Sequence, residues 1–173
     1  NLYFGIFCTL GENADEGHET AHTRRVAADG QPRTMFRDEN IGSDDAVGIM
    51  LDAYNDQRSA VFLATNANGI LFDMSQNGQG ERTRNLNWDM VWESHGQAVP
   101  GGWTAEMRIP FKSLRYRPGV NQVWGFQLRR VIRRKNEGSY LTPLPIEAAR
   151  GGAISGASSS LSRCMWNVRI VPR

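Results

Sequence analysis

Residues 46–74 read AVGIMLDAYNDQRSAVFLATNANGILFDM, and this stretch decides the fold. Val47, Ile49 and Leu51 share one face of an extended chain, as the side chains of a strand do. The pair Asn68-Gly69 favours a tight hairpin turn because both residues tolerate positive φ. The stretch therefore predicts an antiparallel meander of three strands, at residues 46–54, 59–66 and 70–74.

Other strands are expected on both sides of this meander. Residues 103–109 alternate between an apolar and a polar face, which is typical of a half-buried strand. Apolar runs predict further strands at 2–9, 90–99, 123–132 and 166–171. A single helical turn is expected at 110–114, with Pro110 at its start. About eight strands without a long helix predict an all-β, antiparallel β-sandwich of jelly-roll or immunoglobulin-like type with long polar loops.

Length and charge limit the remaining possibilities. The chain has 173 residues and a formal net charge of +2. This length predicts one domain over residues 1–173. Because the sequence opens directly inside a strand, we expect a domain taken from a larger protein and lacking its first strand. The small positive charge gives no argument for nucleic acid as a partner, and no apolar run approaches the roughly 20 residues of a membrane-spanning helix.

Two long stretches, 11–43 and 143–162, have no strand pattern. The first is polar and predicts a long loop with one short helix near 20–28, and the second is rich in small residues and predicts a flexible surface loop. The two cysteines are Cys8 and Cys164. The simpler interpretation is two buried thiols. The alternative is a disulfide between the first and last strands, which requires an oxidising compartment.

Several motifs occur in a characteristic order. They are SDDAVGIMLD at 43–52, NANG at 66–69, WDMVWE at 88–93 and GWTAEMRIPFKSL at 102–114, followed by WGF at 124–126 and RRKNE at 133–137. Together, over about residues 2–140, they resemble the sandwich domain of carbohydrate-binding module family 9. The similarity is strongest to the version at the front of large bacterial proteins that continue into a predicted outer-membrane barrel.

This resemblance implies a non-catalytic module that binds an oligo- or polysaccharide in carbohydrate catabolism. It also implies a location in the periplasm or at the cell surface of a Gram-negative bacterium, with a neighbouring barrel domain as a partner. The alternative function is a structural or docking domain that has lost sugar binding. A third hypothesis is a haem-binding sandwich, which would need a Met/His axial pair.

Tryptophans are the first candidates for sugar contacts, because aromatic faces stack on sugars while amides, carboxylates and Arg bind the hydroxyls. Trp88 stands at the mouth of a polar loop and Trp103 follows a Gly pair, so we expect both at an exposed end of the sandwich. Burial in the core is the alternative for each tryptophan and the preferred interpretation for Trp92, Trp124 and Trp166. The ligand-binding candidates are Trp88, Trp103, Trp92, Arg129 and Glu106.

Charged residues give weaker signals. No cofactor is expected except calcium, which four acidic residues could bind: Asp44, Asp45, Asp52 and Asp73. Asp44 and Asp45 are the metal candidates, and the alternative is a strand-edge acceptor at Asp45 beside a solvated Asp44. The basic run at 129–135 is expected to form surface ion pairs with Glu93, Glu106 and Glu137. A patch for acidic lipopolysaccharide or a neighbouring domain is the alternative.

No enzyme motif is complete. Residues 151–156 lack the order of a nucleophile elbow. His18 and His22 do not form the His-Glu-x-x-His pattern, and nothing in the sequence sets the separation of Glu93 and Glu106 as a glycosidase pair. We therefore expect no catalytic residue in this chain, although the larger protein could carry a hydrolase.

Overall fold

The computed structural model describes residues 1–9, 35–38, 41–78, 84–119, 122–143 and 166–170. The strands in these ranges are β1 (Leu2–Thr9), β2 (Ala46–Asp52), β3 (Ser59–Asn66), β4 (Phe72–Asn77), β5 (Arg84–Asn85), β6 (Glu93–Val99), β7 (Gly102–Ile109), β8 (Gln122–Ile132), β9 (Glu137–Tyr140) and β10 (Trp166–Ile170). The 3-10 turns are η2 (Ile41–Ser43), η4 (Phe111–Ser113) and η5 (Arg133–Lys135).

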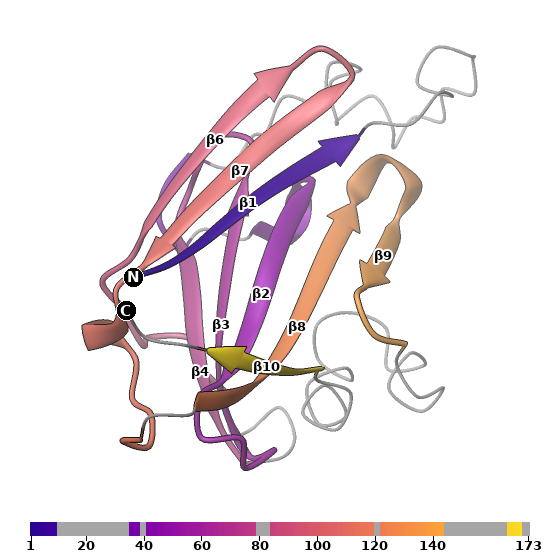
Figure 1. The fold of residues 1–173 in the computed structure, drawn as a ribbon. Coiled ribbons are helices and arrows are strands. Elements are labelled where there is room, and N and C mark those ends of the chain that lie inside the picture. Colours follow the sequence, from indigo (N-terminus) through magenta and orange to yellow (C-terminus); the bar gives the residue numbers. More distant parts are fainter. Residues whose placement is uncertain (10–34, 39–40, 79–83, 120–121, 144–165, 171–173) are drawn as a thin grey trace.

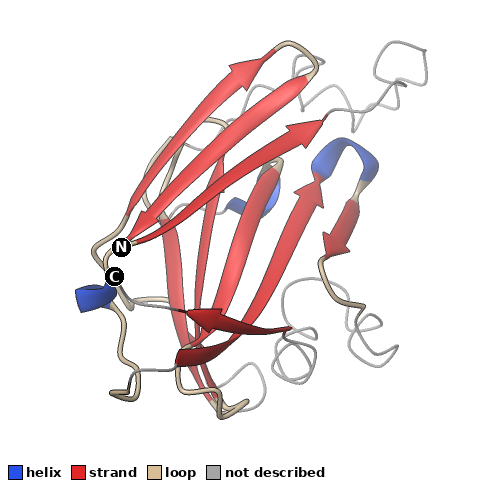
Figure 2. Cartoon of the chain, viewed as in Figure 1, coloured by secondary structure: helices blue, strands red, loops and turns tan. Residues whose placement is uncertain are grey.

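The strands form two antiparallel sheets. The smaller sheet has the order β1-β7-β6, and the larger has the order β10-β8-β2-β3-β4-β5, with β9 paired to β8. Figure 1 shows the smaller sheet as one layer across the larger sheet. Strands and loops make up almost all of the described chain, and the helical segments are single turns (Figure 2). The predicted all-β antiparallel sandwich is therefore confirmed.

The main core lies between the two sheets. From the smaller sheet, β7 contributes Trp103, Ala105, Met107 and Ile109, all buried. From the larger sheet, the inward face of β2 contributes buried Val47, Ile49 and Leu51. Burial of these apolar side chains supplies most of the driving force that holds the sheets together. The alternating pattern of β7 thus arises because only one of its faces meets the other sheet.

A second apolar cluster lies on the opposite face of the larger sheet. It includes Met50 of β2, Phe62 of β3 and Met74 of β4, all buried. Every residue of β2 is therefore buried, and its sequence is apolar almost throughout. Gly48 fits this face because a Cβ built there would lie 2.5 Å from the Phe62 ring.

Strand boundaries differ from prediction where polar residues pair. Expected strands 2–9 and 59–66 coincide with β1 and β3, and the turn at 110–114 contains η4. β4 continues to Asn77 in what was expected to be a loop, while β6 begins only at Glu93. The short polar strands β5 and β9 were not predicted. The expected helix at 20–28, most of the two predicted loops, and Cys164 lie outside the described residues.

In the part of the chain that the structure describes, no helix has the length and apolar character needed to cross a membrane. Cys8 is buried in the main core, and burial raises the pKa of its thiol, an effect that the charge of Arg130 partly offsets. A disulfide between Cys8 and Cys164 stays a prediction.

Two glycines in strands provide a matched test of this packing. A Cβ at Gly48 would meet the Phe62 ring at 2.5 Å and Ala64 Cβ at 3.2 Å, whereas a Cβ at Gly5 would have nothing within 4 Å. We expect Gly48→Ala to lower the free energy of unfolding by about 1–3 kcal/mol through overpacking. Gly5→Ala should raise it by about 0.5–1 kcal/mol, because alanine loses less backbone entropy in a strand. Urea unfolding of both variants checks this, and equal effects would contradict the two-sided burial of β2.

Candidate functional site

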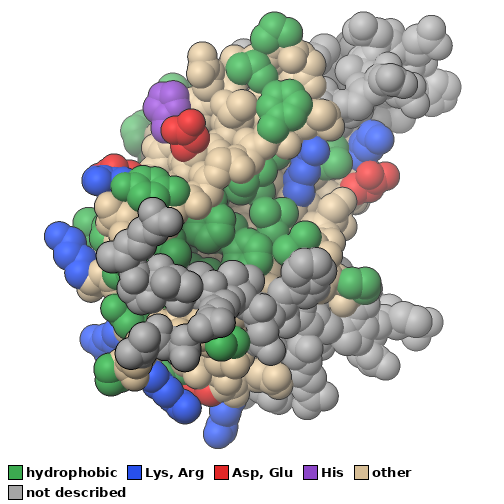
Figure 3. All heavy atoms as spheres, viewed as in Figure 1, with side chains coloured by type: hydrophobic (Ala, Val, Ile, Leu, Met, Phe, Trp, Pro, Cys, Tyr) green, Lys and Arg blue, Asp and Glu red, His purple; other side chains and the backbone are tan. Residues whose placement is uncertain are grey.

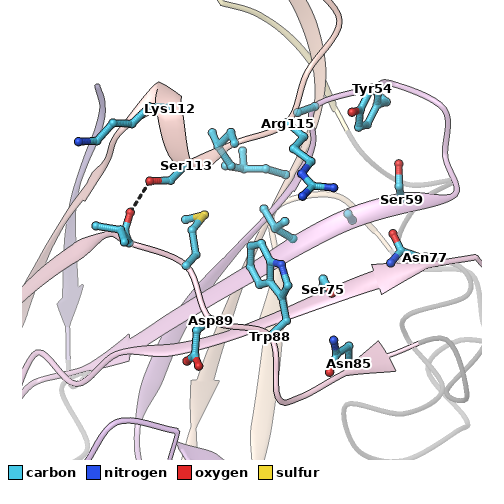
Figure 4. A pocket seen from close by; sticks show the side chains of 17 residues that line it. Tyr54, Ser59, Ser75, Asn77, Asn85, Trp88, Asp89, Lys112, Ser113 and Arg115 are labelled. Carbon is cyan, nitrogen blue, oxygen red and sulfur yellow. Dashed lines mark hydrogen bonds between the residues drawn. The ribbon is translucent and has the colours of Figure 1, made fainter.

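An open pocket of about 730 Å³ lies between the β2–β3 turn, the β4–β5 edge, and the segments that flank β6 and η4. Its polar wall carries amides, hydroxyls and charged groups, and apolar side chains form its floor. Aromatic and polar side chains in the lining are Tyr54, Ser59, Ser75, Asn77, Asn85, Trp88, Asp89, Lys112, Ser113 and Arg115 (Figure 4). This combination suits a ligand that has an apolar face and many hydroxyl groups.

Trp88 is the main aromatic surface of this pocket. Its side chain is half-buried and packs in part against the main core. Figure 4 shows its indole ring inside the pocket, with the guanidinium of Arg115 directed toward it. On one side, Ser113 Oγ donates a 2.7 Å hydrogen bond to the carbonyl oxygen of Val91, which joins the η4 segment to the Trp88 segment.

Asp73 of β4 holds the segment that carries Trp88. Its side chain is fully buried, and it accepts a 2.5 Å hydrogen bond from the Met90 N–H. Arg37 Nη2 donates to both Asp73 oxygens, at 2.7 and 2.9 Å, and to the Met90 carbonyl oxygen at 3.2 Å. Burial raises the pKa of the Asp73 carboxyl, and the Met90 N–H and the Arg37 charge offset only part of that rise. One carboxylate thus joins β4, Arg37 and the segment 88–92.

Two further carboxylates meet the same guanidinium. Asp38 and Asp89 lie 3.2 Å from Arg37 nitrogens, and their oxygens lie within 4.8 Å of those of Asp73. Three acidic groups so close together could hold a cation, but here Arg37 supplies the positive charge. Of this cluster, sequence analysis identifies only Asp73 as a candidate, because Arg37 stands in a polar stretch without periodicity.

Asp52 fixes another wall of the pocket. It ends β2, and its carboxylate accepts hydrogen bonds from the N–H groups of Gln57 at 2.7 Å and Asp56 at 3.3 Å. These bonds close the turn that places Tyr54 beside the pocket. Burial raises the pKa of Asp52, and the same N–H groups oppose that rise. In the same turn, hydrogen bonds from Ser59 and Arg58 lower the pKa of Asp56 although its burial opposes the change.

Two of the tryptophan candidates are in the core. Trp103 is 2% exposed and Trp92 is 3% exposed, so neither has a face available to a sugar. The expectation that Trp103 lies at an exposed end is wrong. Gly101, with φ of 78°, forms the β6–β7 turn, and Trp103 pairs with Cys8 in the interior of the sheet. Burial of Trp124, at 1% exposure, is confirmed, and the side chain of Trp166 lies outside the described residues.

Glu106 and Arg129 lie away from the Trp88 pocket. Glu106 is exposed on β7, where the register places it between Gly5 of β1 and His95 of β6. It lines a separate open groove of about 480 Å³ together with Tyr3 and Arg108. Figure 3 shows hydrophobic, acidic and histidine side chains side by side over this smaller sheet. Of the five ligand-binding candidates, the pocket therefore contains only Trp88.

Arg129 stands on β8 instead, with its guanidinium 5.7 Å from the centre of the Tyr140 ring. Among the described side chains, Glu93 pairs with Arg108, which the register of β6 and β7 places opposite it, and not with the basic run as expected. That contact lowers the pKa of Glu93 and raises the pKa of Arg108.

The metal candidates have separate protein partners. Asp44 Oδ2 accepts a 3.1 Å hydrogen bond from Asn66 Nδ2, and Asp45 Oδ1 accepts one of 2.6 Å from the Arg133 N–H. Both carboxylates are buried, so the solvated Asp44 of the alternative interpretation is wrong, while Asp45 is indeed a strand-edge acceptor. Calcium binding at this pair stays a prediction.

Comparisons with known proteins give matches at the level of structure. No protein-family model and no curated protein sequence matches the chain. A carbohydrate-binding module family 9 domain from Caldicellulosiruptor kristjanssonii, solved in complex with glucose, is similar with a TM-score of 0.50 and 15% identity, over 78% of this chain and 63% of that one. The chain has the fold of a family 9 carbohydrate-binding module. The resemblance seen in the sequence is therefore confirmed at the level of fold.

A second solved structure is similar to the chain with a lower TM-score than the family 9 domain. It is a protein from Bacteroides uniformis ATCC 8492 that is provisionally described as carbohydrate-binding, with a TM-score of 0.48, 11% identity and coverage of 61% of this chain and 54% of that one. The chain thus spans less than two thirds of the length of the family 9 domain and of this protein.

The contacts of Asp73 give a stability prediction. Asp73→Ala leaves the Met90 N–H without its buried acceptor and should lower the free energy of unfolding by about 1–3 kcal/mol. Asp89→Ala is the control, because Asp89 meets the same guanidinium but its side chain is 71% exposed. The control should change stability by less than about 0.5 kcal/mol. Chemical denaturation measures both, and a control as damaging as Asp73→Ala would contradict the role given to the buried carboxylate.

The raised pKa of Asp52 gives a pH prediction. The folded chain binds a proton at Asp52 more tightly than the unfolded chain does, where the usual pKa is 3.8. The stability from this group is therefore fully present below that value and is lost as pH rises through the folded-state pKa. Asp52→Asn cannot titrate and keeps an oxygen for the Gln57 N–H. We expect the unfolding free energy of the wild type to fall relative to this variant as the pH rises over the range above about pH 4. Urea titrations across that range test it, and parallel pH profiles would show that Asp52 does not titrate abnormally.

Proposed function

We propose that this chain is a non-catalytic carbohydrate-binding module that takes a saccharide in the Trp88 pocket. The observation that carries the proposal is the half-buried indole of Trp88 in an open pocket with amide, hydroxyl and guanidinium groups around it. The fold agrees with this function, since the similar family 9 domain is a carbohydrate-binding module solved with glucose.

The pocket divides the recognition of a sugar between two kinds of surface. The apolar C–H face of a pyranose ring stacks on the Trp88 indole, which removes apolar area of both from water. The amides of Asn77 and Asn85 supply donors and acceptors for the ring hydroxyls. Because Asp73 fixes the Trp88 segment to β4, the aromatic surface is in place before the ligand arrives, and binding requires less ordering.

Binding without hydrolysis is the outcome that this pocket favours. Glycosidases commonly use a pair of carboxylic acids on either side of the scissile bond. Among the described residues that line the pocket, Asp89 is the only carboxylic acid, and it contacts Arg37. Within the described lining, the pocket can therefore hold a sugar, but Asp89 has no second carboxyl group beside it for acid–base or nucleophilic work.

The biological setting proposed here rests on the sequence resemblance. In that setting, the module acts in carbohydrate catabolism in the periplasm or at the surface of a Gram-negative cell, as part of a larger protein with a neighbouring barrel domain. Its role there would be to hold a glycan close to the rest of the protein.

A docking domain is the second candidate function. The outer face of β1 exposes Tyr3 by 69% and Phe7 by 56%, and exposed aromatic side chains on a sheet offer area for a partner protein. Failure of the folded protein to bind any saccharide would favour this candidate.

Titration of the purified chain with a panel of oligo- and polysaccharides tests the proposed function. The wild type should bind at least one of them with quenching or a shift of tryptophan fluorescence. Trp88→Ala should weaken that binding by about tenfold or more, since loss of the stacked ring removes about 1.4 kcal/mol or more. Phe7→Ala removes an exposed aromatic side chain outside the pocket and should bind as the wild type does. An equal loss of saccharide affinity in both variants, or undiminished binding by Trp88→Ala, would show that the sugar does not bind in the Trp88 pocket.

A further inference from the structure

The Trp88 pocket has an excess of positive charge on one wall. Lys112 and Arg115 lie on the η4 side of the pocket and are exposed. Among the described residues, no ion pair joins either of them to a carboxylate. Arg115 is the more important of the two, because Figure 4 shows its guanidinium directed toward Trp88 while Lys112 points away at the rim.

Asp89, the one acidic residue in the described part of the lining, does not neutralise this wall. Asp89 lies 3.2 Å from Arg37, on the side of the pocket where Asp73 and Asp38 also meet that guanidinium. In Figure 4 its carboxylate points away from the indole of Trp88. As far as the described residues go, the pocket is therefore polarised: Arg115 has no carboxylate partner on one side of the aromatic surface, and Asp89 is paired with Arg37 on the other.

We propose that the ligand of this pocket is an acidic saccharide, in which a uronic acid residue stacks on Trp88 and places its carboxylate against Arg115. This inference rests on the proposed function and adds the substrate class and a specificity-determining residue. A planar guanidinium binds a carboxylate with two parallel charge-assisted hydrogen bonds, which a neutral hydroxymethyl group at the same carbon cannot form. The polar Asn85 and Asn77 then face the uncharged hydroxyls.

The polarity of the pocket also gives the ligand an orientation. A carboxylate close to Asp89 would be repelled, whereas one close to Arg115 would be attracted. Hydroxyl groups, which can donate to a carboxylate, suit the Asp89 side. An acidic sugar therefore fits in one direction, and a neutral sugar has no comparable preference.

Matched ligands separate charge from sugar identity. Short oligogalacturonates and a glucuronate-bearing xylo-oligosaccharide are each compared with their own methyl esters, which keep the sugar and lose the charge. Neutral cello- and xylo-oligosaccharides complete the panel. We expect the wild type to bind at least one of the two acids about tenfold more tightly than its ester, since a hydrogen bond with a charged group adds about that much. The advantage should shrink as NaCl is raised, because salt screens exposed charges.

Two arginine variants test the assignment within the pocket. Arg115→Gln keeps hydrogen-bond donors but removes the charge, so it should lose most of the preference for the acid and keep its affinity for the ester. Arg117→Gln changes the net charge equally at an exposed residue that does not line the pocket, and it should keep the preference. Loss of the preference in both variants would overturn the role of Arg115.

The outcomes distinguish this inference from the proposed function. Binding of esters or neutral oligosaccharides as tightly as both acids overturns the inference and leaves the carbohydrate-binding function standing. Binding of no saccharide by the folded wild type overturns both. A preference for an acid that Arg115→Gln does not reduce also overturns the inference, because a residue other than Arg115 would then bind the carboxylate of the sugar.

Discussion

The candidate site depends on one buried contact, the carboxylate of Asp73 between β4, the Met90 N–H and Arg37. A buried carboxylate is costly unless hydrogen bonds and an opposite charge compensate it. Here the compensating groups come from two other parts of the chain, so the cost is offset only when the segment 88–92 lies against β4. Because that segment leads directly into β6, the same contact also fixes where β6 begins. The same contact of Asp73 thus determines both the path of the segment 88–92 and one wall of the pocket.

Much of the fold could be predicted because burial of one or both faces of a strand produces a characteristic pattern of apolar residues in the sequence. Residues 103–109 alternate since β7 meets the core on one face only, and the apolar run at 46–52 corresponds to a strand buried on both faces. The strands β5 and β9 have no such pattern in the sequence, since they are short and mostly polar. Trp103 was placed wrongly for a related reason. The Gly pair before it did indicate a turn, but the pairing of β1 with β7, and not the distance from the turn, decides how deep that side chain lies.

Of the candidate site, only the aromatic residue Trp88 could be predicted from the sequence. Trp88 stood out as a tryptophan beside a polar loop, and residue type alone carries that signal. The groups that position it are far from it in sequence: Arg37 reaches Asp73 across 36 residues and Asp73 reaches Met90 across 17. Contacts of this kind have no periodicity and no spacing rule. Arg115 was missed because an arginine after a helical turn is ordinary in a sequence. It becomes informative only in the structure, where no described carboxylate pairs with it.

Burial of Trp92, Trp103 and Trp124 in the core separates stability from recognition in this sandwich. Those three indoles fill the space between the sheets, and exchanging one would disturb packing long before it changed a ligand contact. Trp88, Asn85 and Arg115 instead stand on segments at the rim, where side chains can change at little cost to the core. The charge of the pocket is set there, independently of the strands that build the fold. Two proteins with a similar fold can therefore differ in their ligands, and the ligand has to be inferred from the rim residues of each chain.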